Sequence, residues 1–262
     1  QVGVPSISNP LSSLKKAIVL LPPLPEQKVI AEVLSSLDDK IDLLTRQNKT
    51  LEDLAQACFR KWFIEDASDE WETDILGNYA DITRGASPRP IIKYVENGTF
   101  PWVKIGDATS SSSMFIYETK KNIIEEGISK SVIAYKGEII LSNSATCGFP
   151  YIMGIDGCIH DGWLLFRNYR RLTKWYIYFL LRSMYREIII QADGTVQDNL
   201  NTNILKNLQI TIPEEKLIKT FDNFAESCIQ KISQNDAQIR TLSKLRDTLL
   251  PKLISGEIRV KM

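Results

Sequence analysis

The sequence predicts an α+β fold in which one globular domain is flanked by two long helices that form an antiparallel coiled coil. Two stretches, residues 26–63 and 214–250, place apolar residues at alternating intervals of four and three, the spacing of a helical seam. Between them the sequence changes to short β-branched and aromatic runs separated by turn residues, which is typical of strands. With 44% hydrophobic and 24% charged residues, the chain is able to build an ordinary core.

Residues 1–25 form the first expected segment. The phrase "LKKAIVLLP" at 14–22 parallels "LKNLQITIP" at 205–213, and both are strand-like runs that lead into a proline and a long helix. Because the second copy follows a globular domain, we expect residues 1–13 to be the end of another globular unit. The repeat, together with a first residue that is Gln rather than Met, suggests half of a tandem duplication with something upstream cut away.

The first long helix is expected over residues 26–66. Pro25 suits the first helical turn, where its missing N–H costs nothing, and Glu26 complements the helix dipole. At 1.5 Å per residue, a helix that reaches Phe63 is ~57 Å long. Its seam consists of Ile30, Leu34, Leu37, Ile41, Leu44, Leu51, Ala55, Cys58 and Trp62, with Asn48 as the polar interruption.

The second long helix, expected within residues 206–262, begins after Pro213. We expect it to end near Pro251, which cannot donate the next helical hydrogen bond, and "LISGEIRV" to follow as a tail with a breaker at Gly256. Its seam consists of Ile218, Phe221, Ala225, Cys228, Ile232, Ile239, Leu242 and Leu249, with Asn235 as the polar interruption.

Two narrow seams of equal length are most simply buried against each other. Because the ends of the intervening domain must meet, we expect an antiparallel pair, and the matched Asn48 and Asn235 fit a device that sets the register. The alternative is that each helix packs on its own globular body. The residues expected to hold the coiled coil together are Leu37, Ile41, Leu44, Ile232, Ile239 and Leu242.

Residues 67–205 are expected to form the globular domain. Strands are predicted within "YADITRG", "PWVKIGD", "SVIAYKGEIILS" and "GCIHDGWLLFR", and a helix within "WYIYFLLRSMYREII". This mixture of strands with few helices predicts an α+β or β-rich domain, without defining the order of its strands.

The sequence favours a binding protein over an enzyme. It contains no G-x-G-x-x-G, no P-loop and no G-x-S-x-G motif. The single histidine, His160, has no evident partners for a catalytic triad, and Asp156, Asp161 and Asp193 adjoin glycines, as turn residues do. We therefore expect no catalytic residues.

The four cysteines and the apolar runs exclude other classes. The cysteines lie far apart without a C-x-x-C pair, so we expect no metal site and no disulfide framework. No apolar run approaches the roughly 18 residues of a membrane span, and the first ten residues do not resemble a signal peptide. We expect a cytoplasmic protein that does not associate with a membrane.

Several polar loops of the globular domain are suited to bind DNA. "TRGASPRP" carries two arginines whose guanidinium groups can fork onto guanine or hold a phosphate. Acidic and basic residues balance both in the whole chain, 32 of each, and in residues 71–200, 14 of each, so bulk attraction cannot hold a duplex. The predicted DNA contacts are Arg84, Arg89, Lys93, Asn143 and Arg170; plain solvated loops are the alternative.

The plan of the chain resembles the specificity subunit of type I restriction-modification enzymes. The matching phrases are "LPPLPEQKVIAEVLSSLDDKIDLL", "FRKWF", "PWVKIGD", "DNLNTNILKNLQITIP" and "LLPKLISGEIRV", which together span nearly the whole chain. The resemblance implies that residues 67–205 are a target-recognition domain and that 26–66 and 206–262 hold two conserved spacer helices and a C-terminal tail. Residues 1–25 would then be the tail of a preceding recognition domain and a linker.

The resemblance also implies partners. Members of this family read a bipartite double-stranded DNA site with two recognition domains and dock methyltransferase and restriction subunits. S-adenosylmethionine would be bound by the methyltransferase, so no cofactor is expected in this chain. Having one complete recognition domain, the chain is either a fragment or a half-subunit that forms a homodimer.

Two other functions remain open. The first is the specificity region of a fused methyltransferase-nuclease, which an N-P-P-Y or D-P-P-Y motif would establish, although none occurs in these residues. The second is a coiled-coil scaffold without a role on DNA. Charge reversal at Arg84 and Arg89 distinguishes the scaffold, because it would leave DNA binding by the assembled complex unchanged.

Overall fold

The computed structural model describes residues 15, 22–95, 97–144, 147–193 and 200–260. Most of the expected segment 1–25 therefore lies outside the described residues. The chain divides into two compact units, one made of residues up to Gln47 together with those from Gln234, the other of Asn48–Ser233. Within the described ranges, no helix is both long and apolar enough to cross a bilayer.

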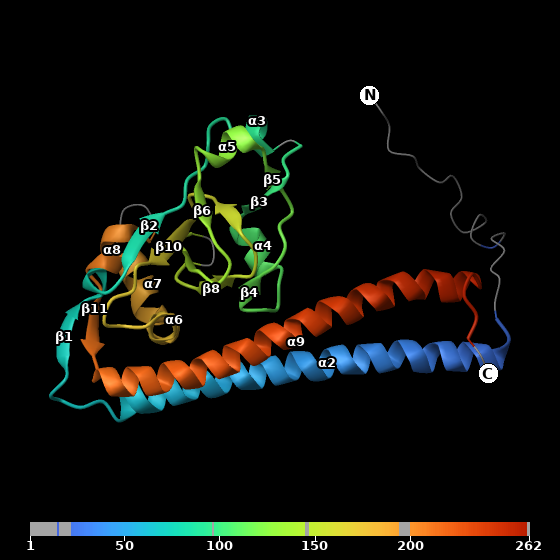
Figure 1. Cartoon of the computed structure of the whole chain (residues 1–262), viewed down its shortest axis with the longest axis horizontal. Coiled ribbons are helices and arrows are strands. Elements are labelled where there is room, and N and C mark those ends of the chain that lie inside the picture. Colours follow the sequence, from blue (N-terminus) through green and yellow to red (C-terminus); the bar gives the residue numbers. More distant parts are fainter. Residues whose placement is uncertain (1–14, 16–21, 96, 145–146, 194–199, 261–262) are drawn as a thin grey trace. The chain divides into compact units, whose positions relative to one another are not determined.

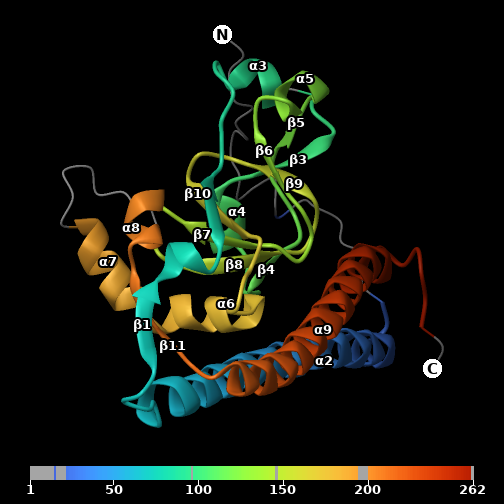
Figure 2. The same ribbon diagram turned by 60° about the vertical axis from the view of Figure 1, so that its left-hand side comes forward.

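Two long helices contribute to both units. Helix α2 spans Leu24–Arg60 and continues as one π-helical turn, η1, at Lys61–Glu65; helix α9 spans Glu215–Ser255. Figures 1 and 2 show them side by side and running in opposite directions. The predicted α+β fold with two long antiparallel helices is confirmed.

In the first unit, ion pairs join the two helical segments. Arg246 Nη1 lies 2.8 Å from Asp38 Oδ1. Further along the chain, Arg259 places its guanidinium on the carboxylate of Glu26, with both N–O distances at 2.5 Å, although Glu26 is only 2% exposed. Since later residues of the second segment meet earlier residues of the first, the pairing is antiparallel.

The predicted seam residues differ in how deeply they are covered. Leu44 and Ile232 are each 3% exposed, and Asn235 is fully buried. Leu37, Ile41, Ile239 and Leu242 are half-buried, as expected for residues at the edges of a seam between two helices.

The expected end of the second helix at Pro251 was wrong. Helix α9 passes through this proline and ends at Ser255, where Gly256 adopts a φ of +76°. Proline removes one hydrogen bond, but Leu253 in the following turn is 3% exposed, and its burial favours one more turn. The amide of Ile258 then donates to the carbonyl of Lys252 at 3.1 Å, so glycine ends the helix.

The second unit contains three sheets and short helices. Their orders are β1-β11, then β2-β10-β7-β8-β4, then β5-β3-β9-β6. The strands are β1 (Glu72–Ile75), β2 (Asp81–Arg84), β3 (Phe100–Val103), β4 (Phe115–Ile116), β5 (Asn122–Ile123), β6 (Val132–Ala134), β7 (Ile139–Ser142), β8 (Pro150–Met153), β9 (Gly157–Ile159), β10 (Trp163–Arg167) and β11 (Gln209–Ile212). The helices are η2 (Leu76–Asn78), α3 (Ile92–Val95), α4 (Ile105–Thr109), α5 (Glu125–Ile128), α6 (Lys174–Ser183), α7 (Tyr185–Asp193) and α8 (Thr202–Lys206).

The five-stranded sheet is buried on both faces. In β10, Leu164 and Phe166 join one core while Trp163 and Leu165 join the other, which is the alternation that a pleated strand imposes. The first core contains the apolar residues of α6, and the second contains Val103 and other residues of the four-stranded sheet. Figure 2 shows α6 on one side of β7 and β8, and β3, β5, β6 and β9 on the other.

Residues 59–63, "FRKWF", pack the end of α2 and the turn η1 against the globular part of this unit. Phe59 and Phe63 are buried, and their ring centroids lie 5.2 and 4.9 Å from that of Tyr176 in α6. Phe221 of α9 packs against both phenylalanines, at 5.3 and 5.4 Å. Three segments distant in sequence therefore share one aromatic cluster, to which edge-to-face and tilted ring pairs add about 1 kcal/mol each beyond burial.

Candidate nucleic-acid interface

The candidate site is organised by the tight turn between β9 and β10. This turn consists of His160, Asp161 and Gly162, between two strands that belong to different sheets. Its amide and carbonyl groups face neighbouring loops: Asn143 donates its backbone N–H to the carbonyl of Gly162 at 2.9 Å. The turn therefore has fixed partners on more than one side.

The end of β2 crosses this turn at close range. Gly85 donates its N–H to the carbonyl of Trp163 at 2.9 Å, and Ala86 donates to that of Ile159 at 3.2 Å. A Cβ atom at Gly85 would lie 2.2 Å from the carbonyl oxygen of His160, so only glycine allows this approach. The arginine-bearing loop "TRGASPRP" is thereby held against the turn.

Three of the five predicted DNA-contacting residues meet at Asp161. Arg84 Nε donates to its backbone carbonyl at 2.7 Å, and Asn143 Nδ2 donates to the same oxygen at 3.0 Å. Arg89 Nη2 lies 3.2 Å from the carboxylate oxygen Oδ2, while Ser87 donates its hydroxyl to Oδ1 at 2.6 Å. Residues from β2, the loop after it and the end of β7 thus converge on one residue.

These residues differ in their access to solvent. The side chain of Arg89 is 73% exposed, and Arg84 is also exposed. Asn143, in contrast, is only 1% exposed and lies beneath the turn. The two arginines can reach a ligand directly, whereas Asn143 supports the turn from below.

The surroundings keep Asp161 ionised and His160 neutral. Burial raises the pKa of Asp161, but the hydrogen bond from Ser87, a backbone hydrogen bond within Asp161 and the nearby charge of Arg89 outweigh it, so that the pKa lies below its ordinary value. Burial lowers the pKa of His160 despite the carboxylate of Asp161, whose Oδ1 lies 3.9 Å from Nδ1. The neutral ring accepts a hydrogen bond at Nδ1 from the amide of Gly162.

A small pocket of about 200 Å³ opens beside this turn. Asp107, which is 7% exposed, shapes one of its walls by accepting the amides of Lys104 and Lys120 at 2.8 and 3.1 Å. The polar and aromatic residues that line the pocket are Ser87, Arg89, Trp102, Lys104, Lys121, His160 and Asp161. Three cations therefore surround one carboxylate, and the balance suits an anionic ligand.

The other two predicted contacts lie outside this cluster. Lys93 is exposed on α3, the short helix whose Ile92 and Val95 line the pocket. Arg170 places Nη2 2.5 Å from Asp81 Oδ1, at the end of β2 opposite Arg84. Three residues of strand, ~10 Å, separate those two ends. The structure thus brings together Arg84, Arg89 and Asn143, and leaves Arg170 apart.

The hydrogen bonds around His160 are not those of a catalytic triad. A triad needs the serine hydroxyl bonded to the imidazole, so that the ring can accept its proton. Ser87 instead donates to Asp161, and Nδ1 of His160 is engaged by Gly162. Among the described residues, no three His, Cys, Asp or Glu side chains gather as metal ligands.

The sequence pointed to the arginines and Asn143 as candidate donors, and it gave no role in the site to Asp161. Asp161 was interpreted only as a turn residue, which it is, but its carboxylate and carbonyl also hold four side chains. The available signal was "IHDGW", two polar residues and a glycine between two apolar runs. Nothing in that pattern reveals that the loop after β2 crosses there.

Comparison with known proteins gives one consistent family. The family model described as "Type I restriction modification DNA specificity domain" matches residues 5–53 and 68–241. The MjaIX specificity subunit, a type I restriction enzyme subunit of Methanocaldococcus jannaschii, is 30% identical, with 95% of this chain and 62% of the relative aligned. The HindI specificity subunit of Haemophilus influenzae is 24% identical, with 88% of this chain and 67% of the relative aligned.

Solved structures agree in fold. A type I restriction-modification S subunit from M. genitalium matches with a TM-score of 0.61 at 18% identity, covering 91% of this chain and 62% of that one. The HsdS subunit of Thermoanaerobacter tengcongensis matches with a TM-score of 0.51 at 19% identity, covering 98% of this chain and 65% of that one. The chain thus spans 62–67% of the length of these relatives and solved structures.

Proposed function

Because the chain belongs to the family of type I restriction-modification DNA specificity domains, we propose that it reads one half of a bipartite DNA site. In this role it is a noncatalytic subunit that docks methyltransferase and restriction subunits in the cytoplasm. Methyl transfer takes place on the methyltransferase subunit, which binds S-adenosylmethionine. The contribution of this chain is to select the sequence.

The observation that carries this proposal is that Arg84 and Arg89 converge on one turn, which their loop can approach closely because a glycine lies at the point of contact. Guanidinium groups fork onto the O6 and N7 atoms of guanine in the major groove, or onto phosphate, when a fixed backbone presents them. Both are exposed here, and hydrogen bonds to Asp161 define their positions. Lys93, Lys104 and Lys121 add charge around the same pocket, while Arg170 extends the surface along β2.

The equal numbers of acidic and basic residues support recognition of the DNA sequence rather than sequence-independent electrostatic attraction to DNA. Lysine and arginine number 14 in residues 71–200, and so do aspartate and glutamate. A domain with no net charge gains little from counterion release, the sequence-independent part of DNA affinity. Contacts to base edges and a second set of contacts from partner subunits must then supply the affinity.

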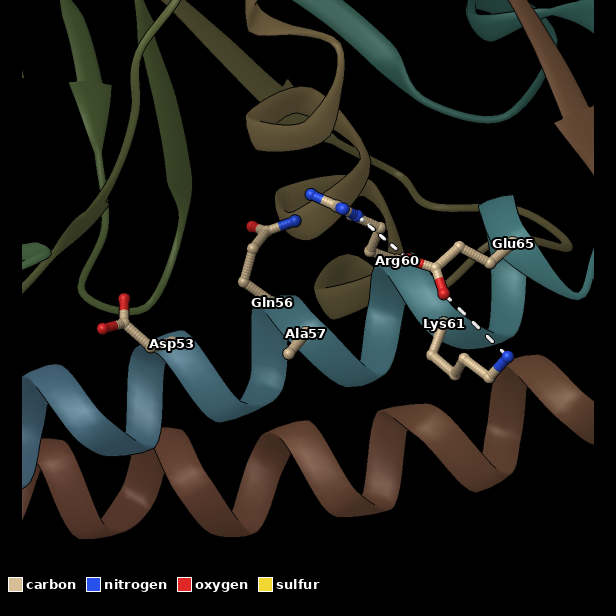
Figure 3. Close-up of a pocket in the computed structure, with 6 residues that line it drawn as sticks. All are labelled: Asp53, Gln56, Ala57, Arg60, Lys61 and Glu65. Atoms are coloured by element: carbon tan, nitrogen blue, oxygen red, sulfur yellow. Dashed lines mark hydrogen bonds and ion pairs between the residues drawn. The ribbon is translucent and has the colours of Figure 1, made fainter.

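We assign docking of the methyltransferase to the outward face of α2 and η1. A groove of about 450 Å³ there is lined by Asp53, Gln56, Ala57, Arg60, Lys61 and Glu65. Figure 3 shows these six side chains. Arg60 and Lys61 reach Glu65 at 3.2 and 3.9 Å. Leu54, which is 46% exposed, precedes Ala57 by three residues and lies on the same helical face.

Replacing Leu54 with Asp tests this docking surface. We expect the variant to co-purify poorly with the methyltransferase subunit, because the substitution places a charge in an apolar contact. Ile190→Asp is the matched control, since Ile190 is 71% exposed on α7. Equal recovery of the methyltransferase with both variants would exclude this face.

A bipartite site needs two recognition domains, and this sequence contains one. The second would come from another copy of this chain or from a further segment of a longer protein. A homodimer predicts a site whose two halves are inverted repeats of each other, since both copies read the same half-site.

The proposal is tested by co-expressing the chain with the methyltransferase subunit encoded beside its gene and mapping methylated adenines across the host genome. We expect a new interrupted motif, palindromic if two copies pair. Arg84→Glu with Arg89→Glu should abolish it, while Arg186→Glu on α7, an exposed arginine elsewhere in the domain, should leave it intact. An assembled complex that adds no sequence-specific methylation would refute DNA reading by this chain.

A further inference from the structure

Asp161 is an anionic residue inside the surface that we propose to bind DNA. A carboxylate beside phosphates costs affinity, because like charges repel and the pocket carries only three cations to offset it. A second acidic residue has the same relation to Arg170: Asp81 accepts a hydrogen bond from Arg170 through Oδ1 and one from Asn168 through Oδ2, at 2.5 and 2.7 Å. Two acids therefore each hold one arginine of the proposed interface.

The two carboxylate oxygens of Asp161 have separate partners. Oδ1 accepts a hydrogen bond from the Ser87 hydroxyl at 2.6 Å, and the same hydroxyl oxygen accepts one from the amide of Asp161 at 3.3 Å. Two hydrogen bonds therefore link Ser87 to the turn. Oδ2 is directed to Arg89, two residues further along the same loop. The carboxylate thus fixes both the path of the loop and the guanidinium at its end.

The guanidinium of Arg89 gains a defined direction from this contact. Its side chain is 73% exposed and would otherwise sample many rotamers, at a cost of up to ~2 kcal/mol when DNA orders it. A single bond at 3.2 Å leaves its other N–H donors available to a base edge or a phosphate. The carboxylate therefore orients the arginine without using up its donors.

We propose that Asp161 is a positioning residue for sequence reading, which preorganises Arg89 and lowers nonspecific affinity for DNA. The proposal rests on the DNA-reading function proposed above. It assigns to the acid two opposing effects, stronger discrimination between sequences and weaker binding to any sequence. A carboxylate with a purely structural role would change neither, beyond the loss of folded protein.

Asp161→Asn separates these effects, because it removes the charge and keeps the size. The backbone carbonyl that holds Arg84 and Asn143 stays in place. Asp156→Asn is the matched control: this exposed acid lies between β8 and β9, where Oδ1 accepts the amide of Lys136 at 2.7 Å, and its loss changes the net charge equally.

The experiment uses the full chain assembled with its methyltransferase, and three readouts. The first is the methylation motif, and the second is the ratio of affinities for a duplex that carries the parent motif and one that does not. The third is the melting temperature of each variant. The parent complex provides the reference: if it methylates no specific motif, the proposed function itself fails, and the role of Asp161 is refuted with it.

With a functional parent, we expect Asp161→Asn to reduce the affinity ratio about tenfold, within the range of one bidentate base contact. Nonspecific affinity should rise, and one base of the motif should become degenerate, while Asp156→Asn keeps the motif and the ratio. The double variant with Asp161→Asn and Arg89→Ala should give the same methylation motif as Arg89→Ala alone, because both substitutions act on the contact of Arg89 with DNA. An unchanged ratio and motif, or an equal effect of both Asn variants, would overturn the proposal.

Discussion

At the scale of single residues, the close approach of two backbone segments determines the site. Gly85 allows the loop after β2 to touch the His160 carbonyl, where a Cβ atom would be 2.2 Å away. Backbone atoms surround that position, so no flexible side chain is able to move aside. The position of the arginine-bearing loop therefore depends on the absence of a single methyl group.

We predict that Gly85→Ala destabilises the folded state by about 2 kcal/mol, the usual cost of overpacking a well-packed site. Urea unfolding measures this difference. Gly106→Ala is the control, because no atom lies within 4 Å of a Cβ built there and the residue is in α4. That variant should be neutral or up to ~1 kcal/mol more stable. Equal stabilities of the two variants would contradict the close approach.

The pH dependence of stability reports on His160, the only histidine of the chain. Burial lowers its pKa in the folded state below the ordinary 6.5. Below pH 6.5 the unfolded chain therefore binds a proton that the folded chain does not, and stability falls as the pH falls. Above pH 6.5 the contribution is complete.

We predict that stability decreases from pH 7 to pH 5, with a slope no steeper than about 1.4 kcal/mol per pH unit from this one group. His160→Gln should flatten the curve in that window. Denaturant titrations at several pH values measure it, and the single imidazole resonance gives the pKa directly. A folded-state pKa above 6.5 would reverse the expected slope and refute the argument.

At the scale of elements, neighbouring residues of α2 differ sharply in burial according to whether they lie on the coiled-coil seam. Leu44 is 3% exposed and Leu43, its neighbour in α2, is 41% exposed. Both are leucines in one helical turn, so their different burial comes from the direction of the side chains alone.

We predict that Leu44→Asp lowers the stability of the helical pair by several kcal/mol, about 3 or more, because it buries a charge without a partner. Leu43→Asp should change it by less than about 1 kcal/mol, since that side chain faces solvent. Circular dichroism at 222 nm during thermal unfolding compares them. Similar melting temperatures of the two variants would mean that the seam does not pass through Leu44.

The helices were predictable from sequence to a greater extent than the site. Apolar spacing predicted both long helices because one periodic stripe determines how a helix packs, and that information is local. Pro251 misled the prediction because the burial of Leu253 beyond it, a tertiary effect, outweighs the lost hydrogen bond. In "FRKWF", two of the aromatic side chains are buried against α6 while the charged residues are exposed, a division that the sequence alone does not reveal.

The site depended on contacts that the sequence does not encode locally. Arg84 and Arg89 were identified by their loop composition, because glycine and proline next to arginine are visible in the sequence. Asp161 lies more than 70 residues from both, and its role depends on the crossing of β2 over the β9–β10 turn. The strand order that creates this crossing, β2-β10-β7-β8-β4, is not contained in any periodic pattern.

At the scale of the whole molecule, the balanced charge of the chain and the ion pairs of the site together limit electrostatic attraction to DNA. The chain carries 32 basic and 32 acidic residues, and two arginines of the proposed interface, Arg89 and Arg170, already form ion pairs with acids. The electrostatic part of DNA affinity should therefore be small for the chain alone. In the proposed complex, partner subunits that contribute cationic surface would supply it.

We predict that the chain alone binds a nonspecific duplex weakly and that its affinity depends little on salt. In the complex, the slope of log K against log salt should be steeper by about 2–3, as expected when several more phosphates are neutralised. Filter binding or fluorescence anisotropy between ~50 and 200 mM salt measures both slopes. In the complex, replacing Arg84 and Arg89 with alanine should remove preference for the parent motif while reducing the slope by no more than about 2. A chain that alone matches the complex in affinity and slope would show that it grips DNA without partners, and the neutral recognition domain would then need another explanation.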